Sequence, residues 1–148
     1  MSEYQENDRM LGAMLRIPFQ AIVDRIEAGL KARGYTDLRP AHFVIFQQIG
    51  SDGARVTELA DQAQITKQSM GALVDTVEAR GYLERIPDPD DRRAKIVRLT
   101  AKGRALERAA REIVAQTEVE WAEKIGKERM EALKQALEAL IMVIEAGE

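Results

Sequence analysis

The 148-residue chain contains no cysteine, one histidine and few aromatic residues, which make up 5% of the total. The lack of cysteine excludes disulfides, thiolate-ligated metals and a thiol-based redox switch within the chain. The single histidine, His42, cannot form a metal site alone, so a role in core packing is the simpler interpretation. We therefore expect no metal ion and no other cofactor.

Long apolar segments are also missing. The longest uninterrupted apolar run, residues 139–144, is far too short to cross a bilayer. The N-terminal residues are polar and acidic, and they lack the basic-then-apolar order of a signal peptide. These features predict a cytoplasmic protein with no membrane partner.

The sequence contains none of the common enzyme motifs. It has no glycine-rich phosphate loop, no histidine paired with a serine or cysteine nucleophile, and no zinc-ligand spacing. Asp88, Asp90 and Asp91 are spaced loosely like a calcium loop, but the glycine at position six and the glutamate at position twelve are absent. We expect that the protein is not an enzyme. The alternative, an uncharacterised enzyme, would require catalytic turnover that survives removal of the arginines at residues 92 and 93.

Positive charge is concentrated in one short stretch, although the whole chain has a net charge of −3. Residues 92–104 hold six cations and no carboxylate: Arg92, Arg93, Lys95, Arg98, Lys102 and Arg104. Residues 54–104 carry a net +2, whereas the segments before and after them carry −1 and −4. This stretch is either a solvated surface or a site for a polyanion.

Apolar residues recur every three or four positions near both ends of the chain, which predicts long amphipathic helices. The first contains Pro18, where a missing backbone donor predicts a kink or a restart, and it ends at Gly34. The last helices begin at Thr100 and run to about residue 124, break near Gly126, and continue to the end. Their apolar faces form either a dimer interface or a bundle within one subunit.

Between these segments the pattern predicts a helix of about ten residues from Pro40, two short helices and a hairpin. Thr57 and Thr66 are expected to cap the short helices, and the second of them ends at Gly81. The strands are predicted at residues 82–86 and 94–99, around a turn rich in Asp and Pro. The expected fold class is mainly α with a small β-hairpin.

Only Gln64 and Ile65 separate the two short helices, so these helices must cross steeply. A steep crossing lets the N-terminal turn of the second helix enter the major groove of DNA. Small and polar residues occupy that turn: Thr66, Lys67, Gln68 and Ser69, with Gly71 and Ala72 after them. An arginine at a narrow tip can enter the minor groove, and we expect Arg92 and Arg93 at the tip of the hairpin. Asp91 would support that tip, and three cations would contact phosphates: Arg85, Lys95 and Arg98.

Three segments resemble the MarR family of winged helix-turn-helix transcription regulators. Residues 56–60, VTELA, are similar to the entry of the helix pair, and residues 73–75 with 80–85 are similar to the end of the recognition helix. Residues 88–93, DPDDRR, followed by residues 97–103, VRLTAKG, are similar to the wing signature of the family. The resemblance covers nearly all of the chain. The sequence departs from the family pattern at Gln64, where glycine is frequent in the turn, and at Pro18, which interrupts the first helix.

The resemblance implies a single MarR-like domain over residues 1–148. Residues 36–100 would form the DNA-binding module, and residues 4–34 and 101–146 the dimerisation helices. It also implies a homodimer on a pseudo-palindromic operator, and a small-molecule effector pocket near Arg16, His42 and Phe46. The leading hypothesis is a repressor released by an effector, and the alternative is a winged-helix protein-interaction adaptor without DNA binding.

Overall fold

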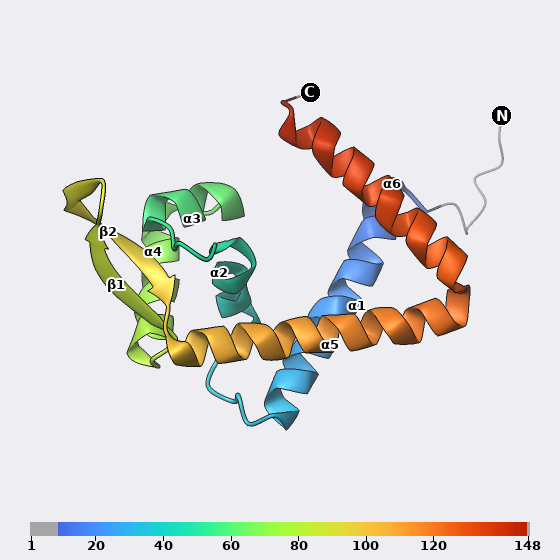
Figure 1. Ribbon diagram of the computed structural model, residues 1–148, viewed down its shortest axis with the longest axis horizontal. Helices are drawn as coiled ribbons and strands as arrows, with labels where there is room; N and C mark the ends of the chain where they lie inside the picture. The colour runs from blue at the N-terminus through green and yellow to red at the C-terminus, as the bar shows by residue number, and fades with distance from the viewer. Residues whose placement is uncertain (1–8, 148) are drawn as a thin grey trace.

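A computed structural model describes residues 9–147 and confirms the mainly helical fold with one β-hairpin. The elements in chain order are α1 Leu11–Ala32, the 3-10 helix η1 Pro40–His42, α2 Phe43–Gln48, α3 Val56–Ala63, α4 Lys67–Ala79, β1 Leu83–Asp88, β2 Asp91–Leu99, α5 Ala101–Ile125 and α6 Lys127–Glu145. The hairpin, α3 and α4 gather at one end of the molecule, and α5 runs from them to the opposite end, where α6 begins, while α1 crosses α5 near its middle (Figure 1). No helix in the described part of the chain is long and apolar enough to cross a membrane.

Of the two outcomes expected at Pro18, a kink or a restart, the restart is wrong, because the first helix continues through this residue. Helix α1 begins at Leu11, and residues 4–8 of the predicted segment lie outside the described residues. It packs closely on α5, because a Cβ atom added at Gly29 would lie 2.6 Å from Cδ1 of Ile113. The helix ends before Gly34, whose φ of +94° suits a residue without a side chain.

The helix predicted from Pro40 is divided into η1 and α2, which together cover residues 40–48. The expected cap at Thr57 is wrong: the N-cap residue of α3 is Arg55, two residues earlier, and its side chain forms no capping hydrogen bond. Helix α3 begins at Val56, because the extended backbone of Arg55 already accepts the first helical hydrogen bond, from the N–H of Leu59 at 3.1 Å.

A tight turn joins α3 to α4. Gln64 adopts the left-handed conformation with φ of 56°, the position where glycine is frequent in the family. Thr66 then caps α4, as predicted, since its Oγ1 accepts a hydrogen bond from the N–H of Ser69 at 3.0 Å. The start of α4 is therefore fixed by its own side chains.

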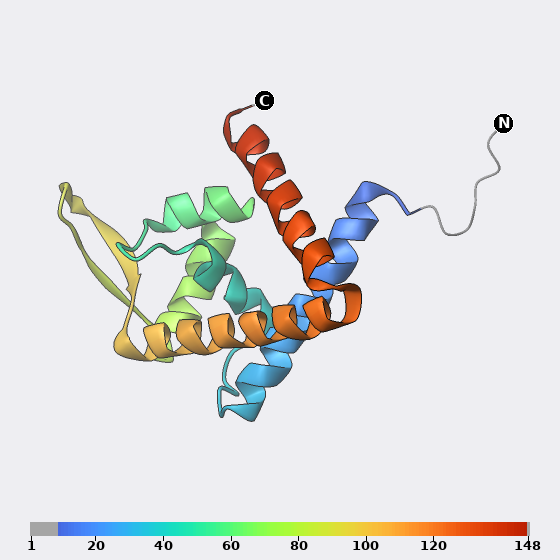
Figure 2. The ribbon, with the colours of Figure 1, turned by 45° about the vertical axis from the view of Figure 1, so that its right-hand side comes forward.

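The hairpin is longer than predicted, and we call β1, the turn at Pro89 and Asp90, and β2 the wing (Figure 2). Regular antiparallel pairing runs from Leu83↔Leu99 to Pro87↔Lys95. Beyond it the register shifts, and the next pair is Asp88↔Asp91. A further backbone bridge between Ala54 and Val97 ties the base of the wing to the segment before α3.

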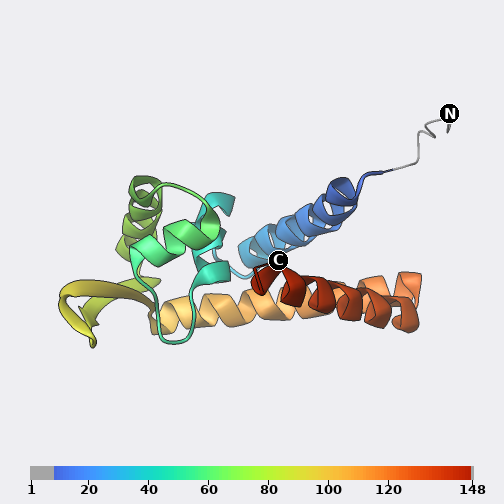
Figure 3. The same cartoon turned by 90° about the horizontal axis from the view of Figure 1, so that it is seen from above.

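One apolar core unites the wing, the short helices, α1 and α5. Its largest fully buried side chains are Tyr82, Leu30, Ile45, Leu59, Met70, Leu106, Val74, Val77 and Val97. The apolar face of α6 and the first half of α1 lie outside this core and remain exposed at the opposite end of the molecule (Figure 3). The apolar side chains around the wing are therefore buried within the subunit, whereas those of α6 and of the first half of α1 are left open to solvent.

Candidate nucleic-acid interface

The wing presents two arginines next to its turn. The turn itself consists of Pro89 and Asp90, and Arg92 and Arg93 follow it within β2, because this strand begins three residues earlier than predicted. Both are exposed, and the Arg93 side chain is 96% exposed. They lie beside the tip and point away from the protein core rather than into it.

Asp91 supports this end of the wing through the backbone. Its Oδ1 accepts a hydrogen bond from the N–H of Arg93 at 3.0 Å, and the same oxygen lies 3.8 Å from Nε of Arg93. The first contact fixes the chain direction after the turn, while the second is too long to immobilise the guanidinium. The side chain of Arg93 stays available to another anion.

A partly buried ion pair that sequence reasoning missed joins the wing to the start of α3. Nε and Nη2 of Arg55 lie 2.8 and 2.6 Å from Oδ2 of Asp88, whose residue is only 7% exposed. Oδ1 of Asp88 accepts a hydrogen bond from the N–H of Asp90 at 2.9 Å. The backbone hydrogen bond from Asp90, followed by the contact with Arg55, lowers the pKa of Asp88, so its carboxylate is charged at neutral pH.

The N-terminal turn of α4 places four polar residues on the surface: Thr66, Lys67, Gln68 and Ser69. Thr66 and Ser69 are engaged with each other, since the Thr66 hydroxyl donates to Oγ of Ser69 at 2.8 Å. The side chains of Lys67 and Gln68 make no hydrogen bond to any other residue between 9 and 147. A Cβ atom at Gly71 would meet nothing within 4 Å, so this face of the helix can approach a flat or concave partner closely.

The three cations expected to contact phosphates have different surroundings. Arg85 bonds to Asp75 at 2.8 Å and to Glu78, which ties β1 to α4. Arg98 bonds to Glu84 at 2.6 Å across the two strands. Lys95 is exposed and, like Arg92, makes no ion pair within residues 9–147.

The three residues expected around an effector pocket do not come together. His42 is buried, its Nδ1 accepts a hydrogen bond from the N–H of Arg39 at 2.9 Å, and burial, followed by the charges of Arg80 and Arg39, lowers its pKa. Phe46 lines an apolar hollow of about 370 Å³ between α1, α2 and α5. Arg16 lines a different hollow, between α1, α5 and α6.

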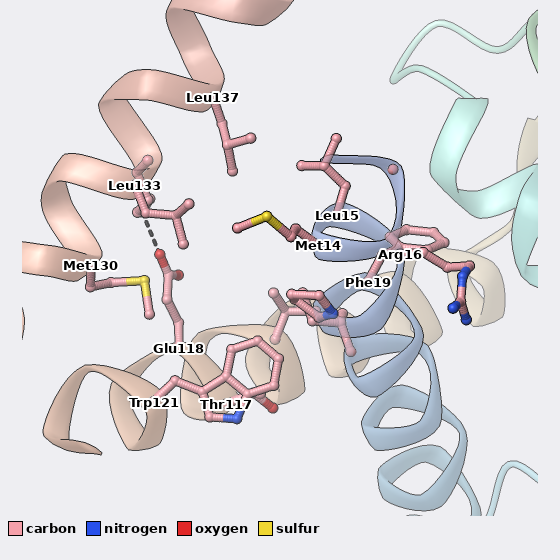
Figure 4. Close-up of a pocket in the computed structure, with 15 residues that line it drawn as sticks. Met14, Leu15, Arg16, Phe19, Thr117, Glu118, Trp121, Met130, Leu133 and Leu137 are labelled. Carbon is pink, nitrogen blue, oxygen red and sulfur yellow. Dashed lines mark ion pairs between the residues drawn. The ribbon is translucent and has the colours of Figure 1, made fainter. Parts of the chain in front are cut away.

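This second hollow is an apolar groove of about 690 Å³ at the end of the molecule away from the wing. In Figure 4, Met14 and Leu15 of α1 lie on the side of that helix that faces Leu133 and Leu137 of α6, and Trp121 of α5 lies below them. One polar contact crosses its edge, from Nζ of Lys134 to Oε1 of Glu118 at 2.6 Å. Large apolar side chains on the same helices are strongly exposed: Met10, Leu11, Met14, Ile17, Phe19, Ile141, Met142 and Ile144.

Comparisons with known proteins agree with this arrangement. The MarR family model matches residues 36–94. Transcriptional regulator Tm0710 from Thermotoga maritima is 30% identical, with 92% of this chain and 94% of that chain covered and a TM-score of 0.64. The transcriptional repressor CouR, bound to a 23-mer DNA duplex, is 28% identical, with 95% and 99% covered and a TM-score of 0.69.

The reduced form of MarR from E. coli shares the fold, with 21% identity, 91% and 98% of the two chains covered, and a TM-score of 0.75. A comparison with curated proteins gave no significant match. The family model covers the helix pair and most of the wing, and the Thermotoga structure extends the similarity over nearly the whole chain. The chain therefore belongs to the MarR family of winged helix-turn-helix transcriptional regulators.

Proposed function

We propose that this protein is a homodimeric transcription regulator that binds double-stranded DNA in a sequence-specific manner and represses until an effector binds. The observation that carries the proposal is the pair of exposed arginines, Arg92 and Arg93, on a wing that is tied through Arg85 to the C-terminal half of α4. The capped N-terminus of this helix is itself exposed. Residues 36–100 would form the DNA-binding module. The similar repressor CouR is bound to a DNA duplex, which supports this assignment.

In this proposal the two parts of the module read different grooves. Lys67 and Gln68 contact base edges or phosphates in the major groove, while Thr66 and Ser69 hold the start of the helix. Arg92 and Arg93 enter the adjacent minor groove, where a narrow width strengthens the negative potential, and Asp91 supports them.

The remaining cations neutralise phosphates without reading sequence. Lys95 is already free to do so within the described chain, and Arg98 and Arg85 contribute when phosphate oxygens compete with their carboxylate partners. Because Asp75 and Glu84 are exposed, their ion pairs with Arg85 and Arg98 add little to stability and exchange readily. The contact of Arg85 with Glu78 is part-buried, so Arg98 is the more available of the two arginines.

The homodimer is inferred from the apolar groove between α1, α5 and α6. A second copy would cover side chains that one subunit leaves open, and a two-fold axis would bury the same face on both subunits. Residues 9–34 and 101–146 would supply that interface. Two wings held in this way fit a pseudo-palindromic operator, and DNA binding would place the protein in the cytoplasm.

The effector is proposed to bind the hollow that Phe46 lines. Phe46 packs edge-on against Tyr82 at 6.3 Å between ring centroids, and Tyr82 lies between α4 and β1. A ligand that displaces Phe46 would therefore act on the end of the recognition helix, provided that it binds the two arrangements unequally. CouR also has a structure bound to p-coumaroyl-CoA, which supports ligand response in a protein of this fold.

The experiment compares Arg93→Ala with Arg108→Ala, a matched loss of one exposed arginine on α5. Fluorescence anisotropy would measure affinity for a duplex selected by the wild type from a random-sequence pool. We expect Arg93→Ala to weaken binding by about tenfold or more and Arg108→Ala to change it little. Failure of the wild type to select any duplex at low salt would favour the protein-interaction adaptor instead.

A further inference from the structure

The arginines of the wing lie where the strand pairing is irregular. Pro87 pairs with Lys95 and Asp88 pairs with Asp91, so residues 92–94 have no opposite partner in the β1–β2 register. Such a bulge redirects side chains and removes the ladder hydrogen bonds that normally fix a strand. The direction of Arg92 and Arg93 must then depend on contacts other than the ladder.

Asp91 supplies one such contact, to the N–H of Arg93, and its partner across the hairpin, Asp88, holds the adjacent turn. One carboxylate oxygen of Asp88 holds the N–H of Asp90 in the turn, and the other holds two nitrogen atoms of Arg55. Arg55 is in turn fixed by the backbone, because it is the N-cap residue of α3 and follows Ala54, which is bonded to Val97 in both directions, at 2.9 and 2.8 Å. The turn of the wing is thus connected to the helix-turn-helix through one buried carboxylate.

We propose that the Arg55–Asp88 ion pair positions the wing relative to the recognition helix, so that Arg92 and Arg93 reach the minor groove while α4 lies in the major groove. This inference rests on the proposed DNA-binding function and assigns to it two positioning residues. Neither residue has to touch DNA for the effect to operate. Its consequence is that the contribution of Arg93 to binding depends on Asp88.

The other ion pairs of the wing cannot perform this task. Arg98–Glu84 joins the two strands to each other and to nothing outside the hairpin. Arg85 attaches β1 to Asp75 and Glu78 of α4, but it does so at the base of the hairpin. Within residues 9–147, Arg55–Asp88 is the ion pair that reaches from the helix-turn-helix to the end of the wing.

The planar guanidinium makes the contact directional. Nε donates a hydrogen bond to Oδ2 of Asp88 and Nη2 lies close to the same oxygen, so rotation of the guanidinium would lengthen at least one of the two contacts. Lysine would keep the charge but provide a single flexible ammonium. Geometry and charge can therefore be tested separately at this position.

Two matched variants separate positioning from simple electrostatics. Asp88→Asn and Glu84→Gln each replace one carboxylate of the same hairpin by an amide of the same shape, so both make the wing more positive by one charge. Electrostatics alone predicts tighter DNA binding for both variants. Positioning predicts that Asp88→Asn weakens binding to the selected duplex while Glu84→Gln does not.

The decisive measurement is the factor by which Arg93→Ala weakens binding to the selected duplex in each background, determined by anisotropy at one fixed salt concentration. We expect a loss of about tenfold or more in the wild type and in Glu84→Gln, and of less than about threefold in Asp88→Asn and in Arg55→Lys. Thermal unfolding of each variant checks that the fold is retained. If Asp88→Asn does not fold, Arg55→Lys carries the same test, because it keeps both charges.

Two negative results have different meanings. If Arg93→Ala weakens DNA binding by the same factor in all four backgrounds, the positioning role is wrong although the DNA-binding function stands. If Arg93→Ala does not weaken DNA binding in the wild-type background, the proposed contact of the wing with DNA is itself wrong.

Discussion

Replacement of Leu133 by alanine should weaken the proposed dimer without unfolding the subunit. Leu133 lies on α6, lines the apolar groove and is 46% exposed in a single subunit. Full burial of a leucine side chain contributes about 1.5–3 kcal/mol, so covering the remaining half contributes roughly 1 kcal/mol. A two-fold axis doubles this contribution, and a loss of about 2 kcal/mol raises the dissociation constant roughly 30-fold.

Sedimentation velocity over a dilution series would measure this dissociation constant. Trp121 is the only tryptophan and lines the same groove, so its fluorescence provides a second measure of the same equilibrium. Gln135→Ala is the matched control, because Gln135 is exposed on α6 and, among residues 9–147, its side chain bonds only to Glu131 of the same helix, at 3.3 Å.

Either of two results would contradict a dimer that buries the apolar groove. One is a wild-type protein that remains monomeric at tens of micromolar concentration. The other is an equal dissociation constant for Leu133→Ala and Gln135→Ala. Either result would mean that the groove is not covered by a second copy.

Three further predictions concern the subunit itself. Gln64→Gly should stabilise the protein by about 0.5–1 kcal/mol, seen as a higher unfolding temperature, because glycine adopts the left-handed conformation without strain; an unchanged or lower temperature would contradict this. Gly103→Ala should destabilise it by about 1–3 kcal/mol in denaturant titrations, because the new Cβ would lie 2.1 Å from the carbonyl oxygen of Tyr82, and full retention of stability would disprove that contact. Since burial lowers the pKa of His42, the unfolded chain binds a proton more readily than the native one, and the free energy of unfolding should fall as pH drops below about 6.5. In His42→Gln this part of the pH dependence should disappear, and an identical pH profile for the two proteins would show that another group causes it.

Local signals in the sequence predicted the parts of the fold that depend on neighbouring residues. Thr66 and Thr100 cap the helices that follow them, and Gly126 separates α5 from α6. These outcomes depend on hydrogen bonds and backbone angles within a few residues. Charge and turn residues likewise predict Arg92 and Arg93 at the tip of the hairpin, and the structure places both of them, exposed, directly after the turn.

Features that depend on distant residues were not predictable in the same way. Arg55 and Asp88 are separated by 33 positions, and neither belongs to a periodic pattern that would link them. Arg85 was expected to be free for phosphate, but α4 brings Asp75 and Glu78 against it. Only the packing of the wing against the helices creates these contacts.

The effector region illustrates the same limit. The expected residues Arg16, His42 and Phe46 lie on or next to the helices that form the hollows, yet they occupy three different environments. Which side of a helix faces a hollow depends on the crossing of α1 and α5, and spacing within one helix does not determine that crossing.

In the proposed dimer, two wings enter the minor groove of one duplex. Because the chain has no cysteine, Asp90→Cys in the exposed turn creates a single site for an iron chelate that cleaves nearby DNA. Bound to its selected duplex, the labelled protein should produce two cleavage maxima, related by two-fold symmetry and located in the minor groove. A single maximum, cleavage centred in the major groove, or cleavage spread evenly along the duplex would contradict the account.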